Sequence, residues 1–220
     1  MQRHYLDSEL AGLAIEVPDV TDTALVLSKI ADFCDELHPE EKLEMHSMAQ
    51  IRQLAFASGR HCAHQAQHML GLAQAPILRD KRVPLWPAAS VGSITHSETV
   101  AGAVVSTSLR GVGLDIESSG RVEEKLFRVL FNEQEKEQIR NARFDAATVM
   151  FSAKEAGYKA IYPTGRKFIG FLEAQIILNP AAQTFTISYL GDHAPNRVLE
   201  RGYGYWREHH GQILTLFMIE

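Results

Sequence analysis

The chain is poor in cysteine, in basic charge and in long apolar runs. Its 220 residues include two cysteines, Cys34 and Cys62, and neither belongs to a Cys-x-x-Cys pair. This excludes a disulfide framework and suits a reducing compartment. No apolar stretch approaches the ~18 residues that a membrane-spanning helix needs. The first ten residues lack a basic head followed by an apolar run, so we expect a cytoplasmic protein that has no secretory signal and no membrane association.

Charge and glycine patterns exclude further classes of protein. The chain has 22 Lys and Arg against 27 Asp and Glu, a net charge of -5, which argues against a nucleic-acid binder that neutralises phosphates. The segment GVGLDI lacks the third glycine of the dinucleotide fingerprint, and no Walker-type GK[ST] occurs. Hydrophobic residues make up 45% of the chain, which is enough for a sizeable core.

Apolar periodicity predicts helices and strands in both halves of the chain. A helix should begin at Pro39, be interrupted at Gly59 and end near Gly71, and Pro163 should stop a second helix. Residues 74–93, with three prolines, indicate an extended loop. The other predicted elements are strands at 13–17, 24–30, 92–97, 101–108, 111–118, 171–178, 184–190 and 213–220, and a helical segment at 122–142 broken at Asn132. This mixture suggests two α/β subdomains that meet near residues 107–111.

The segment GVGLDIE, residues 111–117, places two acids two residues apart. Because side chains alternate along a strand, Asp115 and Glu117 should share the face opposite to that of the apolar residues. Two carboxylates on one face repel unless a cation lies between them, and Mg²⁺ prefers such oxygen ligands. The alternative is an exposed strand face with solvated acids.

The segment FSAKEAGYK, residues 151–159, places three charges in an apolar helix. Glu155 and Lys159 are four residues apart and lie on one face, with Lys154 beside them. A surface ion pair is the plain alternative, although the apolar neighbours leave little room for a broad polar face.

Cationic side chains that suit phosphate groups occur earlier in the chain. Arg52 and Arg60 belong to a predicted helix, Lys81 and Arg82 to the proline-rich loop, and His96 follows a short strand. Each is also compatible with an ordinary surface or structural role.

Three histidines at helical spacing offer a different site. His64 and His68 are four residues apart, a spacing that suits zinc, and His61 lies close to both. No third and fourth ligand pattern follows, so we favour histidines on the wet side of an amphipathic helix.

Taken in order, these segments resemble the 4'-phosphopantetheinyl transferase superfamily, most closely its single-chain group associated with siderophore and other nonribosomal peptide synthesis. The two signatures of that family correspond to GVGLDIE at 111–117 and FSAKEAGYK at 151–159. Three upstream pieces also match: GRHCA at 59–63, KRVPLWP at 81–87 and GSITHS at 92–97. Five ordered matches over about 100 residues, from 59 to 159, outweigh the alternatives for each segment alone.

The resemblance implies an α+β fold of two similar α/β subdomains, 1–108 and 109–220, related by a pseudo-twofold axis with the ligand cleft between them. It implies an enzyme of the holo-[acyl-carrier-protein] synthase type that transfers 4'-phosphopantetheine from coenzyme A to a carrier-protein serine and releases adenosine 3',5'-bisphosphate. Mg²⁺ is the expected metal, with Mn²⁺ as a substitute. The alternatives are a Mg²⁺-dependent nucleotide phosphoesterase and a non-catalytic module that binds coenzyme A or a carrier.

The resemblance also implies a role for each site residue. The metal ligands are Asp115, Glu117 and Glu155, and either Glu155 or a metal-bound water is the base. Lys159 stabilises the leaving group and Lys154 contacts phosphate or pantetheine. The residues expected to hold the nucleotide of coenzyme A are Arg52, Arg60, Lys81, Arg82 and His96.

The expected partner is an acidic carrier protein, and we expect a monomer because the two halves supply the cleft internally. Since the chain is itself acidic, the docking face must be locally basic or apolar. The sequence offers the segment at 140–144 and the region of Arg121, Lys125 and Arg128 for this surface.

Overall fold

The protein is an α+β protein made of two compact units, Met1–Leu109 and Arg110–Glu220. A computed structural model describes residues 1–5, 7–15, 17, 20–46, 48–81 and 83–220. The division between the units falls one residue after the expected end of the first subdomain at residue 108. Each unit consists of a sheet on which one 20-residue helix packs. In the described segments, no helix is long and apolar enough to cross a membrane.

The sheet of the first unit has the strand order β1-β2-β6-β5 in the part of the chain that the structure describes. The strands are β1 (Gln2–Tyr5), β2 (Thr23–Lys29), β5 (Val91–His96) and β6 (Val100–Ser106). The hairpin expected from GSITHS and the apolar segment after it is confirmed, because β5 and β6 pair antiparallel. All seven residues of β6 are buried, as expected for a central strand covered on both faces.

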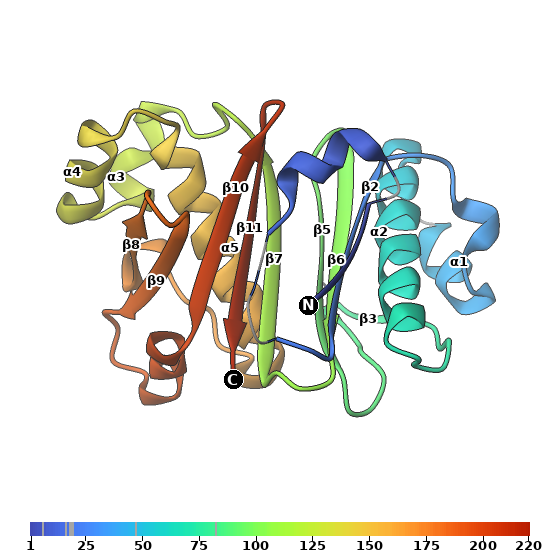
Figure 1. The fold of residues 1–220 in the computed structure, drawn as a ribbon. Helices are drawn as coiled ribbons and strands as arrows, with labels where there is room; N and C mark the ends of the chain where they lie inside the picture. The colour runs from blue at the N-terminus through green and yellow to red at the C-terminus, as the bar shows by residue number, and fades with distance from the viewer. Residues whose placement is uncertain (6, 16, 18–19, 47, 82) are drawn as a thin grey trace. The chain divides into compact units, whose positions relative to one another are not determined.

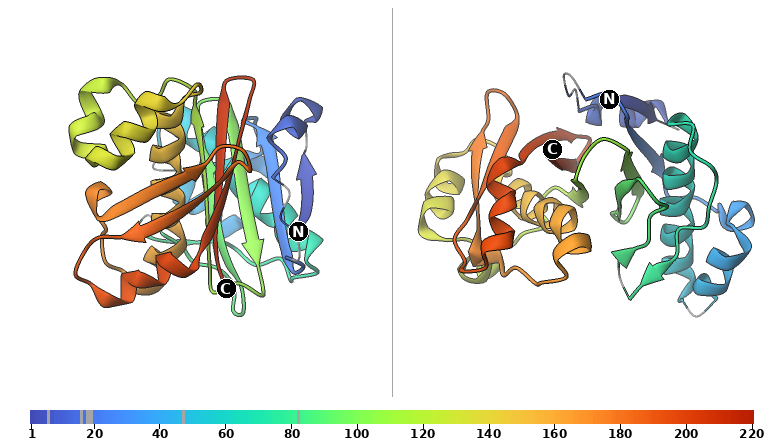
Figure 2. Two further views of the ribbon diagram at one scale, coloured as in Figure 1. Left: turned by 60° about the vertical axis from the view of Figure 1, so that its left-hand side comes forward. Right: turned by 90° about the horizontal axis from the view of Figure 1, so that it is seen from below.

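Helix α2 (Gln50–Met69) covers this sheet and packs on β2 and β6. Helix α1 (Pro39–Met45) lies on the side of α2 that faces away from the sheet, as Figure 1 and the right view of Figure 2 show. The predicted interruption at Gly59 was wrong, because α2 runs through it. A Cβ there would lie 2.7 Å from Cγ2 of Ile94, so the glycine allows helix and strand to approach closely. This packing outweighs the cost of about 1 kcal/mol that glycine carries inside a helix.

The proline-rich segment is not a plain loop. It forms a short hairpin of β3 (Arg79–Asp80) and β4 (Val83–Pro84). Lys81 lies at its turn with a positive φ of 59°, and Arg82 lies outside the described residues. Two short 3₁₀ segments, η1 (Ser8–Leu13) and η2 (Cys34–Glu36), complete the described elements of this unit.

The second unit has a five-stranded antiparallel sheet with the order β7-β11-β10-β9-β8. Its strands are β7 (Gly111–Ser118), β8 (Ala174–Asn179), β9 (Thr184–Tyr189), β10 (Tyr203–His209) and β11 (Gln212–Ile219). Strand β10 escaped the sequence prediction, because YGYWREH mixes aromatic, glycine and charged residues without clean alternation.

Helix α5 (Ala146–Gly165) packs on β7 and β11 and contributes most of the helical part of the core of this unit. The prediction that Pro163 ends it was wrong by two residues. A proline in the last turn removes a single backbone donor, and the cap at Arg166 (φ 50°) ends the helix instead. Gly157 fits a close contact, since a Cβ there would lie 2.4 Å from Cδ1 of Ile187.

The remaining helices connect β7 to α5. The predicted break at Asn132 is confirmed, because Asn132 caps α4 (Glu133–Asn141) and forms a capping box with Glu135. The other short elements of this unit are η3 (Glu124–Leu126), α3 (Phe127–Leu130), η4 (Phe171–Glu173) and η5 (Ala194–Arg201).

Candidate functional site

Strand β7 and helix α5 approach so closely that only glycine fits between them. A Cβ at Gly113 would lie 1.8 Å from the carbonyl oxygen of Ala156, and one at Gly111 would lie 2.5 Å from that of Ala160. The glycines of GVGLDIE therefore serve the contact between strand and helix. Their consequence is that the next acid on the strand, Asp115, meets side chains of α5 directly.

Asp115 is buried, and both of its carboxylate oxygens bind side chains of α5. Lys159 Nζ donates to Oδ1 at 2.7 Å, and Ser152 Oγ donates to Oδ2 at 2.8 Å. Ser152 also lies 2.8 Å from the hydroxyl of Thr215, the residue opposite Asp115 on β11. The carboxylate is thus oriented from both sides. Sequence reasoning missed Ser152 and Thr215, because an uncharged hydroxyl in a core pattern gives no signal of its own.

Glu117 and Glu155 share the electrostatic field of Asp115. Burial, followed by the charge of Asp115, raises the pKa of Glu117 to about 7, although Arg121 lies 3.6 Å from its carboxylate. Burial and then Asp115 also raise the pKa of Glu155, and Lys159 opposes this. The strand and the helix therefore bring the three predicted acids into one interacting group. Among the described residues, however, no set of three His, Cys, Asp or Glu side chains is arranged to hold an ion as it stands.

Lys159 connects this acidic group to the strand backbone. Its ammonium donates to the carbonyl oxygen of Leu114 at 3.0 Å as well as to Asp115. The side chain is 28% exposed, so it is reachable from solvent while its position is set by the strand. Lysine in this setting supplies a localised positive charge beside the acids.

Lys154 does not lie where it was expected. Its Nζ is buried and donates to three protein oxygens: Glu135 Oε2 at 2.9 Å, the Leu130 carbonyl at 2.7 Å and the Phe171 carbonyl at 2.7 Å. An ammonium has three N–H donors, and all three are used inside the protein. Since no donor remains for phosphate or pantetheine, we correct the predicted contact with coenzyme A and assign Lys154 a structural role.

In the first unit, Arg60 is a buried guanidinium that lacks a full set of partners. It is 4% exposed, and its Nε lies 3.8 Å from Oε1 of Glu41. Within the described residues, Nε and Nη2 have no hydrogen-bond partner. Burial lowers the pKa of Arg60 to about 10, and the charge of Glu41 opposes this. A buried cation with unused donors is suited to receive an anion.

The other predicted cations come from different elements of the first unit. Arg52 is exposed in the first turn of α2, Lys81 is exposed at the turn of the β3–β4 hairpin, and His96 is exposed at the end of β5. The contact between Gly59 and Ile94 places the Arg60 segment of α2 against the strand that ends at His96.

Sequence reasoning missed two acids and an arginine that surround Arg60. Glu41 is fully buried and accepts hydrogen bonds from the Ile77 amide at 2.8 Å and from His64 Nε2 at 3.0 Å. Glu44 binds the amide and the Nε of Arg79, whose guanidinium lies over the same Phe56 ring as that of Arg60. Glu41 thus ties α1 to the segment before the hairpin, and Glu44 ties it to β3.

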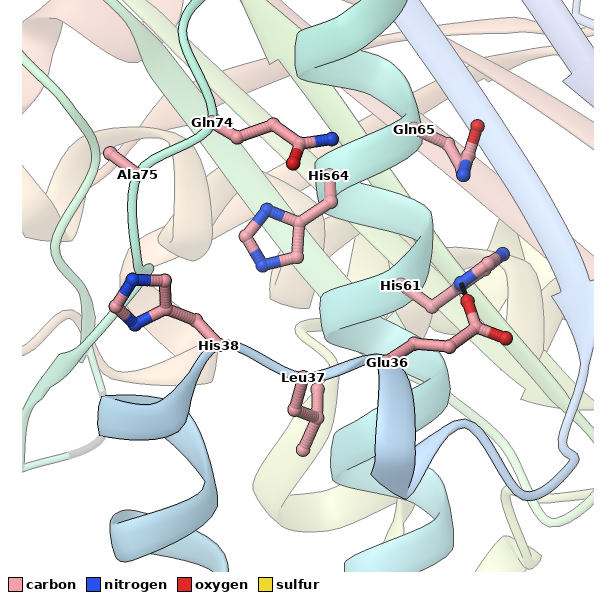
Figure 3. A pocket seen from close by; sticks show the side chains of 8 residues that line it. All are labelled: Glu36, Leu37, His38, His61, His64, Gln65, Gln74 and Ala75. Carbon is pink, nitrogen blue, oxygen red and sulfur yellow. Dashed lines mark ion pairs between the residues drawn. The ribbon is translucent and has the colours of Figure 1, made fainter.

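His38, His61 and His64 line a small cavity of about 160 Å³ beside α2, whereas His68 does not. Figure 3 shows His38 and His64 facing the same space and His61 paired with Glu36, whose carboxylate lies 2.7 Å away. Both ring nitrogens of His64 have protein partners, one with Glu41 at 3.0 Å and one with Gln67 at 3.2 Å.

Comparisons with known proteins match two consecutive segments of the chain. Residues 39–106 match the family model described as the 4'-phosphopantetheinyl transferase N-terminal domain, and residues 111–213 match that of the 4'-phosphopantetheinyl transferase superfamily. The chain is 31% identical over 193 residues to 4'-phosphopantetheinyl transferase Svp of Streptomyces mobaraensis, which covers 83% of this chain and 78% of the relative. It is 30% identical to 4'-phosphopantetheinyl transferase PptT of Mycobacterium tuberculosis, covering 82% and 85%. It is 32% identical to Enterobactin synthase component D of Escherichia coli, covering 67% and 73%.

Proposed function

Since the chain belongs to the 4'-phosphopantetheinyl transferase superfamily, we propose that it transfers 4'-phosphopantetheine from coenzyme A to a serine of an acyl or peptidyl carrier protein. The second product is adenosine 3',5'-bisphosphate. The observation that carries the proposal is the interacting group of Asp115, Glu117 and Glu155, which lies beside the ammonium of Lys159.

The acids suit a hard divalent cation such as Mg²⁺, with Mn²⁺ as a substitute. Their donor set consists of carboxylate oxygens, which such cations prefer. Burial first, and then the charge of Asp115, raise the pKa values of Glu117 and Glu155, and a bound cation would favour the charged form of both acids. Asp115, Glu117 and Glu155 would hold the ion. When bound, it would offset the charge that develops on the diphosphate of coenzyme A.

The residues of α5 supply the proton and charge chemistry. The serine hydroxyl forms a new bond to the phosphorus on the pantetheine side, and the bond from that phosphorus to the bridging oxygen breaks. Glu155 takes the serine proton, and its raised pKa brings it closer to the working pH, where a general base is most effective. Lys159, which is partly exposed next to Asp115, stabilises the negative charge of the leaving phosphate.

The first unit would recognise the nucleotide. Arg60 offers buried, unused N–H donors, and its surroundings suit the 3'-phosphate of coenzyme A. His96, Arg52 and Lys81 are the further proposed contacts.

Mass spectrometry tests the proposal directly. The protein is incubated with coenzyme A, Mg²⁺ and an apo peptidyl carrier domain, and the likeness to Enterobactin synthase component D supports siderophore carrier domains as the first acceptors. A carrier that gains the mass of one phosphopantetheine, together with free adenosine 3',5'-bisphosphate, supports the transfer. Nucleotide cleavage without carrier modification would identify a phosphoesterase, and binding of coenzyme A without either product would identify a non-catalytic module.

The substitutions Asp115→Ala and Glu155→Ala separate the catalytic group from the fold. Both variants should lose transfer while the melting temperature shows a folded protein. Wild-type turnover by either one would refute the assignment of the acids.

A further inference from the structure

One face of α5 carries aromatic side chains around the proposed base. Phe151, Glu155, Tyr158 and Tyr162 follow one another at spacings of four, three and four residues, and all four are partly exposed. Such spacing puts them on one stripe of the helix. The Tyr158 and Tyr162 rings lie 4.9 Å apart. Burial first, then Tyr162 and the charge of Glu155, raise the pKa of Tyr158.

The segment after α5 extends this stripe with an exposed phenylalanine. Phe168 is 67% exposed, the largest value among the exposed large apolar side chains of the second unit. Its ring packs edge-on against Tyr158 with centroids 5.7 Å apart. Leu172 follows and is 47% exposed. We call the set of Tyr158, Tyr162 and Phe168 the aromatic ridge.

Contacts with α5 and within the segment that follows Phe168 position the aromatic ridge. Lys154, directly before Glu155, donates to the carbonyl oxygen of Phe171 at 2.7 Å. The rings of Phe151 and Phe171 lie 5.6 Å apart, and Glu173 accepts from the Gly170 amide at 2.7 Å. These contacts anchor the residues directly after Phe168, so its exposed side chain belongs to a segment that is fixed to α5.

Between Glu155 and Glu173 the ridge segment carries only basic charges. Residues 156–172 contain Lys159, Arg166 and Lys167 and no Asp or Glu, although acids outnumber bases in the chain as a whole. Arg166 and Lys167 are both exposed. An apolar surface bordered by positive charge complements an acidic partner that presents an apolar side chain of its own.

We propose that the aromatic ridge, with Lys167 beside it, is the docking surface for the acidic carrier protein. This inference rests on the proposed function, because the carrier serine must reach Glu155 and the ridge occupies the same face of the same helix. Exposed aromatic side chains are the residue type that most often dominates binding energy at protein interfaces. Lys167 adds long-range attraction to the acidic carrier, which mainly speeds its approach.

The surfaces expected from the sequence fit a docking role less well. Arg121 lies 3.6 Å from Glu117, and Lys125 lies 2.7 Å from Glu123, so both cations have acidic neighbours. Phe144 stacks on Trp206 with centroids 4.9 Å apart and packs against the core of the unit. These contacts reduce the charge of Arg121 and Lys125 and the apolar surface of Phe144 that are available to a partner.

Steady-state kinetics with an apo peptidyl carrier domain test the docking surface. Phe168→Ala and Lys167→Glu should each raise KM for the carrier roughly fivefold to tenfold, the effect expected of an interface hot spot. KM for coenzyme A should stay within about twofold of the wild-type value, because neither side chain touches the proposed nucleotide site. The effect of Lys167→Glu should shrink at high salt, because the attraction it removes is screened.

Two matched controls separate docking from a general loss of structure. Ile177→Ala removes an apolar side chain that is 48% exposed on β8, and Lys125→Glu reverses a cation outside the ridge. Both should leave KM for the carrier unchanged. Melting temperatures of all four variants report whether the fold survives.

The outcomes distinguish this inference from the proposed function. If the wild-type protein modifies the carrier and Phe168→Ala does so with unchanged KM, the docking surface is wrong and the transfer stands. If Lys125→Glu raises KM for the carrier and Lys167→Glu does not, the carrier docks at the other surface. If light scattering shows a dimer that Phe168→Ala converts to a monomer, a second copy of the chain covers the ridge and the inference fails. If the wild-type protein modifies neither an acyl nor a peptidyl carrier, the proposed function itself fails.

Discussion

Replacing Gly113 by alanine should damage both the fold and the active site of this protein. The added Cβ would lie 1.8 Å from the carbonyl oxygen of Ala156 and 2.9 Å from the amide nitrogen of Ala160. Real Cβ atoms keep at least 3.0 Å from such atoms, so β7 and α5 must separate by about 1.2 Å or more at this point, the difference between 3.0 and 1.8. Both obstacles are backbone atoms of a buried helix, which cannot turn aside as a side chain can.

The separation acts on the hydrogen bonds that position Asp115. Its bonds to Lys159 at 2.7 Å and to Ser152 at 2.8 Å cross the same strand-helix contact, two residues further along β7. A shift of 1.2 Å would stretch them to nearly 4 Å, beyond hydrogen-bond length. Overpacking of a core typically costs 1–3 kcal/mol, and we expect a loss of about 3 kcal/mol because the clash is with backbone. A misplacement of about 1 Å at a catalytic group also reduces turnover roughly 100-fold.

Urea unfolding and the carrier-modification assay measure the two effects. Gly165→Ala is the matched control, since a Cβ there meets no atom within 4 Å and its φ is not positive. It should keep wild-type stability and turnover. Gly157→Ala should lose an intermediate amount of stability. Its Cβ would clash with Cδ1 of Ile187 at 2.4 Å, which is the end of a side chain and can move more easily than backbone. A Gly113→Ala protein with wild-type stability would refute the contact, and one with lowered stability but full turnover would refute its link to the active site.

Three further predictions follow from buried charges and thiols. Lys154→Met leaves the buried carboxylate of Glu135 without its cation, so the free energy of unfolding in urea should fall by about 3–5 kcal/mol; a loss of coenzyme A affinity at unchanged stability would restore the phosphate role. Arg60→Met should raise KM for coenzyme A while KM for dephospho-coenzyme A stays the same, and an equal rise for both substrates would contradict a 3'-phosphate site. Burial raises the pKa of Cys62 from 9.0 to about 12. The folded protein therefore holds the thiol proton more tightly than the unfolded chain, so stability should fall as pH rises above 9, and a Cys62→Ala variant should lose less between pH 9 and pH 11. An identical slope in both proteins would show that the thiol is not buried.

The type of most secondary elements followed from local sequence signals. Pro39 marked a helix start and Asn132 a helix break, and apolar alternation marked β8, β9 and β11. Prediction failed where a tertiary contact overrides a local preference. Gly59 and Pro163 are helix breakers by propensity, yet Gly59 lies inside α2 because it packs against Ile94 of β5, and Pro163 is tolerated because it lies in the last turn of α5.

The sequence predicted the acids of the candidate site better than it predicted the roles of its lysines. The two motifs predicted that Asp115 and Glu155 act together. In the structure, burial and then the charge of Asp115 raise the pKa of Glu155. Lys154 and Lys159 both belong to the second motif and look equivalent in sequence. Their roles separate only through neighbours distant in the chain, since Lys154 meets Glu135 and Phe171 whereas Lys159 meets Asp115.

The sequence by itself determined the family, the type of most long elements and the identity of the charged residues, because these depend on residue types and their spacing along the chain. Only the tertiary structure decided which charges are buried in pairs, which glycines let strand and helix approach closely, and which aromatic side chains remain exposed beside Glu155. The physical reason is that burial and pairing are set by atoms brought close by the fold, and residues such as Asp115 and Lys159 lie 44 positions apart along the chain.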